Sequence, residues 1–132
     1  MGNNTTRARV LLADDHVGNI LLLQGLLEME FDVVGAVQSG HALVGAAETL
    51  WPDVIVSDIA MPGVDGIEAA KRILCRNAAA RIVFVTVHDE PEMVSLALAI
   101  GALGYVFKAV AAEELVPAVR AALRGERHTS AH

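Results

Sequence analysis

Short runs of β-branched and other apolar residues alternate five times with amphipathic stretches along this chain of 132 residues. The runs predict strands at about residues 8–13, 32–37, 53–57, 81–85 and 104–107. The stretches place apolar residues at helical spacing and predict helices at about residues 17–29, 40–50, 66–76, 91–100 and 112–124. A chain that alternates strands with helices forms a parallel sheet with helices on both faces. We therefore predict a single α/β domain of the doubly wound type.

The composition agrees with this fold. Hydrophobic residues make up 54% of the chain, and the strands of a parallel sheet are apolar on both sides because helices cover both faces. The domain is predicted to occupy residues 8–125. Residues 1–7 are predicted to be a disordered N-terminal segment. Residues 126–132 are predicted to be a C-terminal tail, either a frayed end or the start of a linker.

Charge and hydropathy exclude several classes of function. The net charge of −6 gives no general attraction to nucleic acid or to an anionic membrane. The first nine residues are polar or basic and predict no secretory signal. The longest apolar stretch, residues 93–107, is too short and too interrupted to span a bilayer. The single Cys75 cannot form an internal disulfide and is predicted to be a packed thiol. These features predict a cytoplasmic protein without a membrane partner.

Four of the five predicted strands end in residues that phosphoryl chemistry can use. Asp14 and Asp15 follow the first strand, Asp58 follows the third, Thr86 ends the fourth, and Lys108 follows the fifth. Ligands of an open parallel sheet bind outside the carboxyl ends of its strands. We therefore expect these side chains to converge on one site.

The chemistry of these groups suits a divalent cation and a phosphoryl group. Carboxylates a few ångströms apart repel each other unless a cation lies between them, and hard oxygen ligands favour Mg²⁺ or Mn²⁺ over Zn²⁺. Asp58 could attack a phosphoryl group and form an acyl phosphate. Lys108 could pair with phosphoryl oxygens, and Thr86 could donate a hydrogen bond to one. The alternative interpretation is that the acidic residues are helix caps or solvated loop charges.

Taken together, these motifs identify a family resemblance. Asp14-Asp15 after an apolar strand, the segment Asp-Ile-Ala-Met-Pro-Gly-Val-Asp-Gly at residues 58–66, Thr86, and Gly-Tyr-Val-Phe-Lys at residues 104–108 are similar to the receiver domain of two-component response regulators. The resemblance covers residues 8–125. It implies a flavodoxin-like (βα)5 three-layer sandwich, with a five-stranded parallel sheet of order 2-1-3-4-5.

The resemblance also implies roles for individual residues. Asp58 would be the phosphoacceptor for a sensor histidine kinase. Asp15, Asp58 and the backbone carbonyl of Ala60 would bind Mg²⁺ directly, and Asp14 would do so through water. Lys108 would contact the phosphoryl group. A domain of this kind assists its own phosphorylation and dephosphorylation but turns over no metabolite, so it is not an enzyme in the ordinary sense.

Two further residues are implied as a switch pair. Thr86 would turn toward the phosphoryl group, and Tyr105 would then rotate inward. This would reshape the face formed by the fourth helix, fifth strand and fifth helix, which controls the output.

The ends of the domain resemble one branch of the family. Asp14-Asp15-His16 and residues 124–130 are similar to the LuxR/NarL-type branch, whose members carry a C-terminal helix-turn-helix. That branch implies transcription control, a homodimer formed on phosphorylation, and contact with DNA only through an output domain not present in this chain. A stand-alone receiver is the alternative.

Four positions depart from the common pattern of the family. Val87 replaces a residue that is often small, and its branched side chain is expected to narrow access to the site. Ala109 replaces a proline that many members have, which puts a cis peptide after Lys108 in doubt. Ala60 and His88 occupy positions that control how water reaches the acyl phosphate, and we expect an altered dephosphorylation rate.

Three alternative functions share parts of this pattern. A phosphatase of the haloacid dehalogenase type needs a second aspartate two positions after the nucleophile, where this chain has Ala60. A cobalamin-binding module needs Asp-x-His-x-x-Gly after the first strand, and Asn19 stands in place of the glycine. His16 is accordingly interpreted as a loop or cap residue and not as a metal ligand. A phosphorylation-independent receiver that acts as a protein-binding module remains open.

Overall fold

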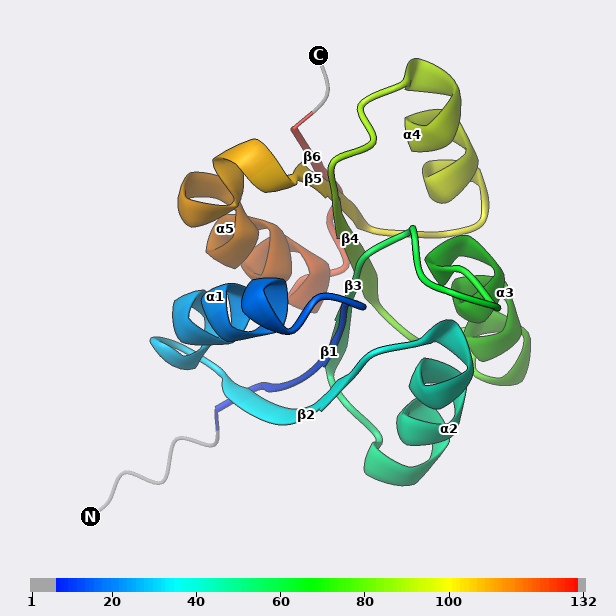
Figure 1. The fold of residues 1–132 in the computed structure, drawn as a ribbon, viewed down its shortest axis with the longest axis horizontal. Helices are drawn as coiled ribbons and strands as arrows, with labels where there is room; N and C mark the ends of the chain where they lie inside the picture. Colours follow the sequence, from blue (N-terminus) through cyan, green and yellow to red (C-terminus); the bar gives the residue numbers. More distant parts are fainter. Residues whose placement is uncertain (1–6, 131–132) are drawn as a thin grey trace.

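The computed structural model describes residues 7–130, which form one parallel sheet with helices on both faces (Figure 1). Across these residues the six strands have the order β2-β1-β3-β4-β5-β6. The strands are β1 (Arg9–Ala13), β2 (Asp32–Val37), β3 (Val54–Ser57), β4 (Ile82–Thr86), β5 (Gly104–Phe107) and β6 (His128–Thr129). The helices are α1 (Val17–Glu28), α2 (Gly40–Leu50), α3 (Gly66–Arg76), α4 (Pro91–Ala99) and α5 (Ala111–Leu123), with a 3₁₀ turn η1 (Lys108–Val110) before α5. The predicted α/β fold and the order 2-1-3-4-5 of its first five strands are confirmed.

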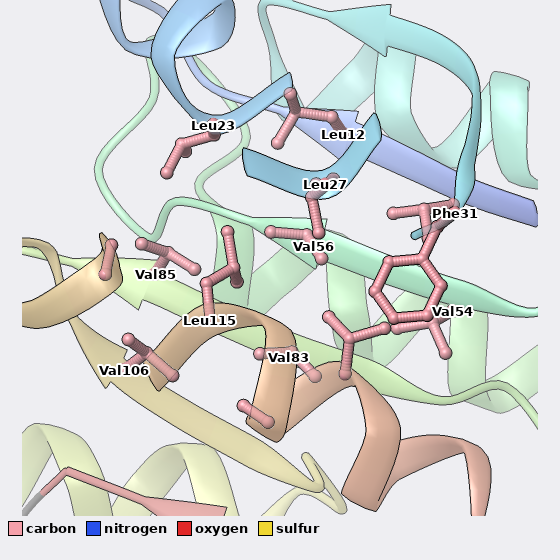
Figure 2. Packing of buried hydrophobic residues seen from close by; sticks show 14 of the residues in the cluster. Leu12, Leu23, Leu27, Phe31, Val54, Val56, Val83, Val85, Val106 and Leu115 are labelled. Atoms are coloured by element: carbon pink, nitrogen blue, oxygen red, sulfur yellow. The ribbon is translucent and has the colours of Figure 1, made fainter. Parts of the chain in front are cut away.

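Each face of the sheet has its own apolar core. Helices α1 and α5 cover one face, where Leu23, Leu27 and Leu115 pack on side chains from the strands (Figure 2). Helices α2, α3 and α4 cover the other face (Figure 1). Successive strand residues serve opposite cores: Leu12 belongs to the first and Leu11 to the second. This two-sided burial explains why the strands show continuous apolar runs without polar alternation.

Local signals in the sequence fix several helix ends. The Ser39 side chain accepts a hydrogen bond from the Ala42 amide and caps α2. Asp65 caps α3 in the same way, through the Glu68 amide. Pro91 occupies the first turn of α4, where a missing amide hydrogen costs nothing.

The structure corrects the prediction about Cys75, which is exposed on α3 and is not a packed thiol. Helix α1 buries only part of its apolar surface, because Leu21 and Leu22 face solvent while Leu23 and Leu27 fill the core. A helix on the surface of a sheet buries only one side, so a helix that is apolar on most sides must expose some leucines.

The C-terminal tail also differs from the prediction. Residues 128–130 are not a frayed end: β6 pairs with β5 in a parallel register, and Ser130 is buried. Whether a linker follows stays a prediction. The predicted disordered segment lies outside the described residues except for Arg7, which donates to the carbonyls of Glu28 and Glu30.

Two further observations concern the described part of the chain. All of its peptide bonds are trans, including the bond between Lys108 and Ala109. None of its helices combines the length and the apolar character needed to cross a bilayer.

Candidate functional site

The predicted site residues gather at the edge of the sheet where β1, β3, β4 and β5 end. Ala13 lies opposite Ser57 in the parallel pairing of β1 with β3, and the amide of Asp58 donates to the carbonyl of Ala13 at 2.9 Å. Asp14 and Asp58 are therefore carried to neighbouring positions by two buried strands. Thr86 closes β4 one strand further along, and Lys108 follows β5.

A single ammonium group joins the two buried carboxylates. Lys108 Nζ lies 2.8 Å from Asp58 Oδ2 and 2.8 Å from Asp14 Oδ2. Burial by itself would lower the pKa of Lys108, but the contacts with Asp14 and Asp58 outweigh it and raise the pKa above its ordinary value. Lys108 is therefore a stable cation held against both acids.

Asp14 and Asp15 have different surroundings although they are neighbours. Asp14 is fully buried; its Oδ1 accepts from the His16 amide at 2.9 Å, and among the described residues its Oδ2 meets only the Lys108 ammonium. Asp15 is partly exposed, and its Oδ1 lies 3.0 Å from His16 Nδ1. The backbone turn after β1 thus directs one carboxylate into the protein and the other toward solvent.

These acids fit a hard divalent cation. Asp14, Asp15 and His16 each offer a ligand atom, and the three atoms lie within 4.8 Å of one another. The buried Asp14 Oδ2 has spare capacity to accept, because the Lys108 ammonium is its one partner among the described residues. Carboxylate oxygens beside solvent suit Mg²⁺ or Mn²⁺. His16 is the N-cap residue of α1, as the sequence predicted, although its ring nitrogen also lies in this group.

The loop after β3 holds Asp58 tightly. Asp58 Oδ1 accepts from the Ile59 amide at 2.7 Å, and the Asp58 carbonyl accepts from the Ser57 hydroxyl at 2.7 Å. The loop folds back on itself, since the Gly66 amide donates to the Ile59 carbonyl at 2.7 Å. A Cβ at residue 66 would lie 2.1 Å from the Asp58 carbonyl oxygen, so only glycine fits there. Sequence reasoning missed Ser57, although a hydroxyl directly before the acid was a usable signal.

Thr86 and Tyr105 are linked through the backbone of His88. The His88 amide donates to Thr86 Oγ1 at 3.3 Å, and the Tyr105 hydroxyl donates to the His88 carbonyl at 2.7 Å. The Tyr105 ring is fully buried and makes edge contacts with Phe84 and Phe107. Burial, followed by the negative charge of Glu90, raises the pKa of Tyr105 to about 12. Tyr105 is thus turned inward in this structure.

The predicted rate-tuning positions are Val87, His88 and Ala60. Val87 is exposed at the rim, and Ala60 is exposed in the loop after Asp58. The His88 ring is partly exposed, and its Nδ1 lies 3.5 Å from Glu90 Oε1. All three positions therefore lie on short segments that directly follow Thr86 or Asp58.

Comparison with known proteins identifies the class. The sequence profile of the family described as "Response regulator receiver domain" matches residues 10–120. The chain belongs to the receiver domains of two-component response regulators. This membership removes the dehalogenase and cobalamin-binding interpretations.

Individual relatives agree with the LuxR/NarL-type branch. The chain is 38% identical over 128 residues to the uncharacterized transcriptional regulatory protein YxjL of Bacillus subtilis (strain 168), a match that covers 93% of this chain and 57% of that protein. It thus spans less than two thirds of this curated relative. The signal receiver domain of the response regulator NarL from Mycobacterium tuberculosis has a TM-score of 0.88 at 31% identity, covering 92% of this chain and 100% of that one. The isolated receiver domain of RcsB from Salmonella enterica serovar Typhimurium, studied with the phosphomimetic BeF₃⁻, has a TM-score of 0.86 at 29% identity, covering 94% of each chain.

Proposed function

We propose that this domain accepts a phosphoryl group on Asp58 from a sensor histidine kinase, in a reaction that needs Mg²⁺, and that the modification controls an output through the face formed by α4, β5 and α5. The observation that carries this proposal is the Lys108 ammonium, 2.8 Å from both Asp58 and Asp14. A buried acid held beside a cation, next to further carboxylates, is suited to receive an anionic group. We place the protein in the cytoplasm, where such kinases hold their phosphoryl group.

The transfer is a single displacement at phosphorus. A carboxylate oxygen of Asp58 forms the new bond to phosphorus, and the bond between phosphorus and the donor's nitrogen or oxygen breaks, so that the donor leaves with the bonding electrons. Lys108 then pairs with the phosphoryl oxygens as a compact charge. Asp14, Asp15, Asp58 and the Ala60 carbonyl would hold Mg²⁺, which when bound neutralises charge on the transferred group.

Phosphorylation of Asp58 affects Tyr105 through Thr86 and the backbone of His88. A phosphoryl oxygen on Asp58 offers the Thr86 hydroxyl a stronger acceptor than a neutral partner does. A shift of Thr86 acts on His88, whose amide donates to Thr86 Oγ1 and whose carbonyl accepts from Tyr105. Val87, His88 and Ala60 lie where water would approach the acyl phosphate, and we propose that they set its lifetime.

The surface beside the site supports a protein as donor. Val17, Leu21 and Leu22 on α1 are 57%, 65% and 62% exposed, and α1 begins directly after His16. Exposed apolar patches of this kind mark contacts with other proteins. We propose that the kinase docks on these residues and presents its phosphohistidine to Asp58.

The output is proposed from the relatives. The match covers 57% of YxjL, which carries the name of an uncharacterized transcriptional regulatory protein. We propose that phosphorylation favours a homodimer and that DNA is contacted only through a C-terminal output domain. A phosphorylation-independent binding module is the second candidate.

The deciding experiment is intact mass spectrometry after incubation with acetyl phosphate, with and without Mg²⁺. We expect a Mg²⁺-dependent phosphoryl adduct on the wild type and none on Asp58→Asn. Asp65→Asn is the matched control, because Asp65 is an exposed carboxylate in the same loop and asparagine also caps helices well. An adduct that persists in Asp58→Asn would place the phosphoryl group elsewhere. An unmodified wild type, with acetyl phosphate and with a kinase alike, would favour the binding module.

A further inference from the structure

The last described residues cover the free edge of β5. The His128 amide donates to the Leu103 carbonyl at 2.9 Å, and the Ser130 amide donates to the Tyr105 carbonyl at 2.8 Å. In Figure 1, β6 lies directly beside β5 at the end of the sheet. Without β6, the carbonyls of residues 103 and 105 would lie on an unpaired sheet edge. The tail is therefore an integral part of the sheet next to the switch residue.

Ser130 closes this arrangement with its side chain. It is buried, and its hydroxyl accepts from the Phe107 amide at 3.2 Å while it donates to Glu114 Oε1 at 2.8 Å. Glu114 lies in the first turn of α5, and its Oε1 also lies 3.2 Å from His128 Nε2. One carboxylate on α5 thus anchors two residues of the tail.

The Ser130 hydroxyl accepts a hydrogen bond from the backbone of Phe107, one residue before Lys108. Phe107 lies opposite Thr86 in the pairing of β5 with β4, and Lys108 comes next along the chain. The end of β5 is therefore held by β4 on one side and by Ser130 on the other. The backbone position at the start of η1 fixes the Cα of Lys108. It therefore determines how well the Lys108 ammonium is placed against Asp14 and Asp58.

We propose that Ser130 is a positioning residue for Lys108, and that the C-terminal tail thereby sets the rate at which Asp58 is phosphorylated. The inference rests on the proposed function, because it concerns the rate of that reaction. Removing the hydroxyl leaves the Phe107 amide without its acceptor in a part-buried place. The end of β5 then loosens, and the ammonium is less well placed.

The test compares phosphorylation rates with acetyl phosphate at saturating Mg²⁺. Ser130→Ala is expected to slow the reaction by about three- to tenfold, the range for loss of one buried hydrogen bond. Ser130→Thr keeps a hydroxyl and is expected to recover most of the rate. Ser95→Ala, at an exposed serine on α4, is the control and should match the wild type.

A double-mutant cycle separates positioning from a general loss of stability. If Ser130 acts through Lys108, Ser130→Ala should have no further effect on the rate in a Lys108→Ala background. A second readout, hydrogen exchange of the Phe107 amide, should become faster in Ser130→Ala in step with the loss of rate.

Two results would overturn the inference: a wild-type rate in Ser130→Ala despite faster exchange of the Phe107 amide, or the same slowing with and without Lys108. A wild type that forms no adduct on Asp58 would be a different result. It would refute the proposed function itself, and this inference with it.

Discussion

The single tyrosine of the chain, Tyr105, should lose its phenolic proton only near pH 12, because burial and nearby negative charge raise its pKa to about 12. The ordinary value, which applies to the unfolded chain, is about 10. The folded state therefore holds this proton more tightly than the unfolded state does. The resulting stability is complete below pH 10 and is lost as the pH rises toward about 12.

The size of the effect follows from the two pKa values. A difference of about two units corresponds to about 2.7 kcal/mol in the free energy of unfolding. Tyr105→Phe removes the group that titrates, so the variant does not lose this stability at high pH. It also removes the hydrogen bond to the His88 carbonyl, which costs about 0.5–1.5 kcal/mol at all pH values below 10. We therefore expect the wild type to be the more stable protein at neutral pH and the variant to be the more stable one near pH 12. Lys108, whose pKa is also raised, is common to both proteins and cancels in the comparison.

The assay is a titration of tyrosinate absorbance, with far-ultraviolet circular dichroism recorded on the same samples to report folding. Because the chain has one tyrosine, the absorbance change belongs to Tyr105 alone. Glu90→Gln should bring the midpoint closer to 10, since the Glu90 charge is the second cause of the shift. Half-ionisation near pH 10 while the circular dichroism is still native would refute the reasoning, and it would mean that Tyr105 points to solvent.

Three other predictions test separate parts of the structure. Gly66→Ala should lower the free energy of unfolding by about 1–3 kcal/mol in urea denaturation, because its Cβ would meet the Asp58 carbonyl oxygen at 2.1 Å. Gly45→Ala, in open space within α2, should instead raise the free energy of unfolding by about 0.5–1 kcal/mol. Equal effects of the two substitutions would contradict the close contact between residue 66 and Asp58. Cys75 should react with Ellman's reagent in the folded protein at the rate of a free thiol; protection until denaturant is added would show that it is buried. Leu22→Gln should leave the urea midpoint and the acetyl phosphate rate unchanged but slow transfer from a kinase, and an unchanged kinase rate would exclude α1 as the docking surface.

The fold class, and the edge of the sheet that carries the chemistry, could be predicted from the amino-acid sequence. Apolar runs at strand length, alternating with stretches of helical period, permit few arrangements other than a parallel sheet covered on both faces. Parallel strands end at one common edge, so Asp14, Asp58, Thr86 and Lys108 had to be neighbours once the strands were located. Local chemistry also determined the caps at Ser39 and Asp65, because these hydrogen bonds span only three residues.

Contacts between side chains that are distant in sequence, and the surfaces that stay exposed, depend on how the whole chain packs. Lys108 meets acids that lie 50 and 94 positions earlier in the chain, and no local pattern shows that its ammonium bridges both. In an almost entirely apolar helix such as α1, the outward position of Leu21 depends on where the sheet and α5 lie. The pairing of β6 depends on β5 being the edge strand, which is a property of the whole sheet. Residues with polar, short-range signals were therefore predictable, whereas burial and edge pairing depend on neighbours that are distant in sequence.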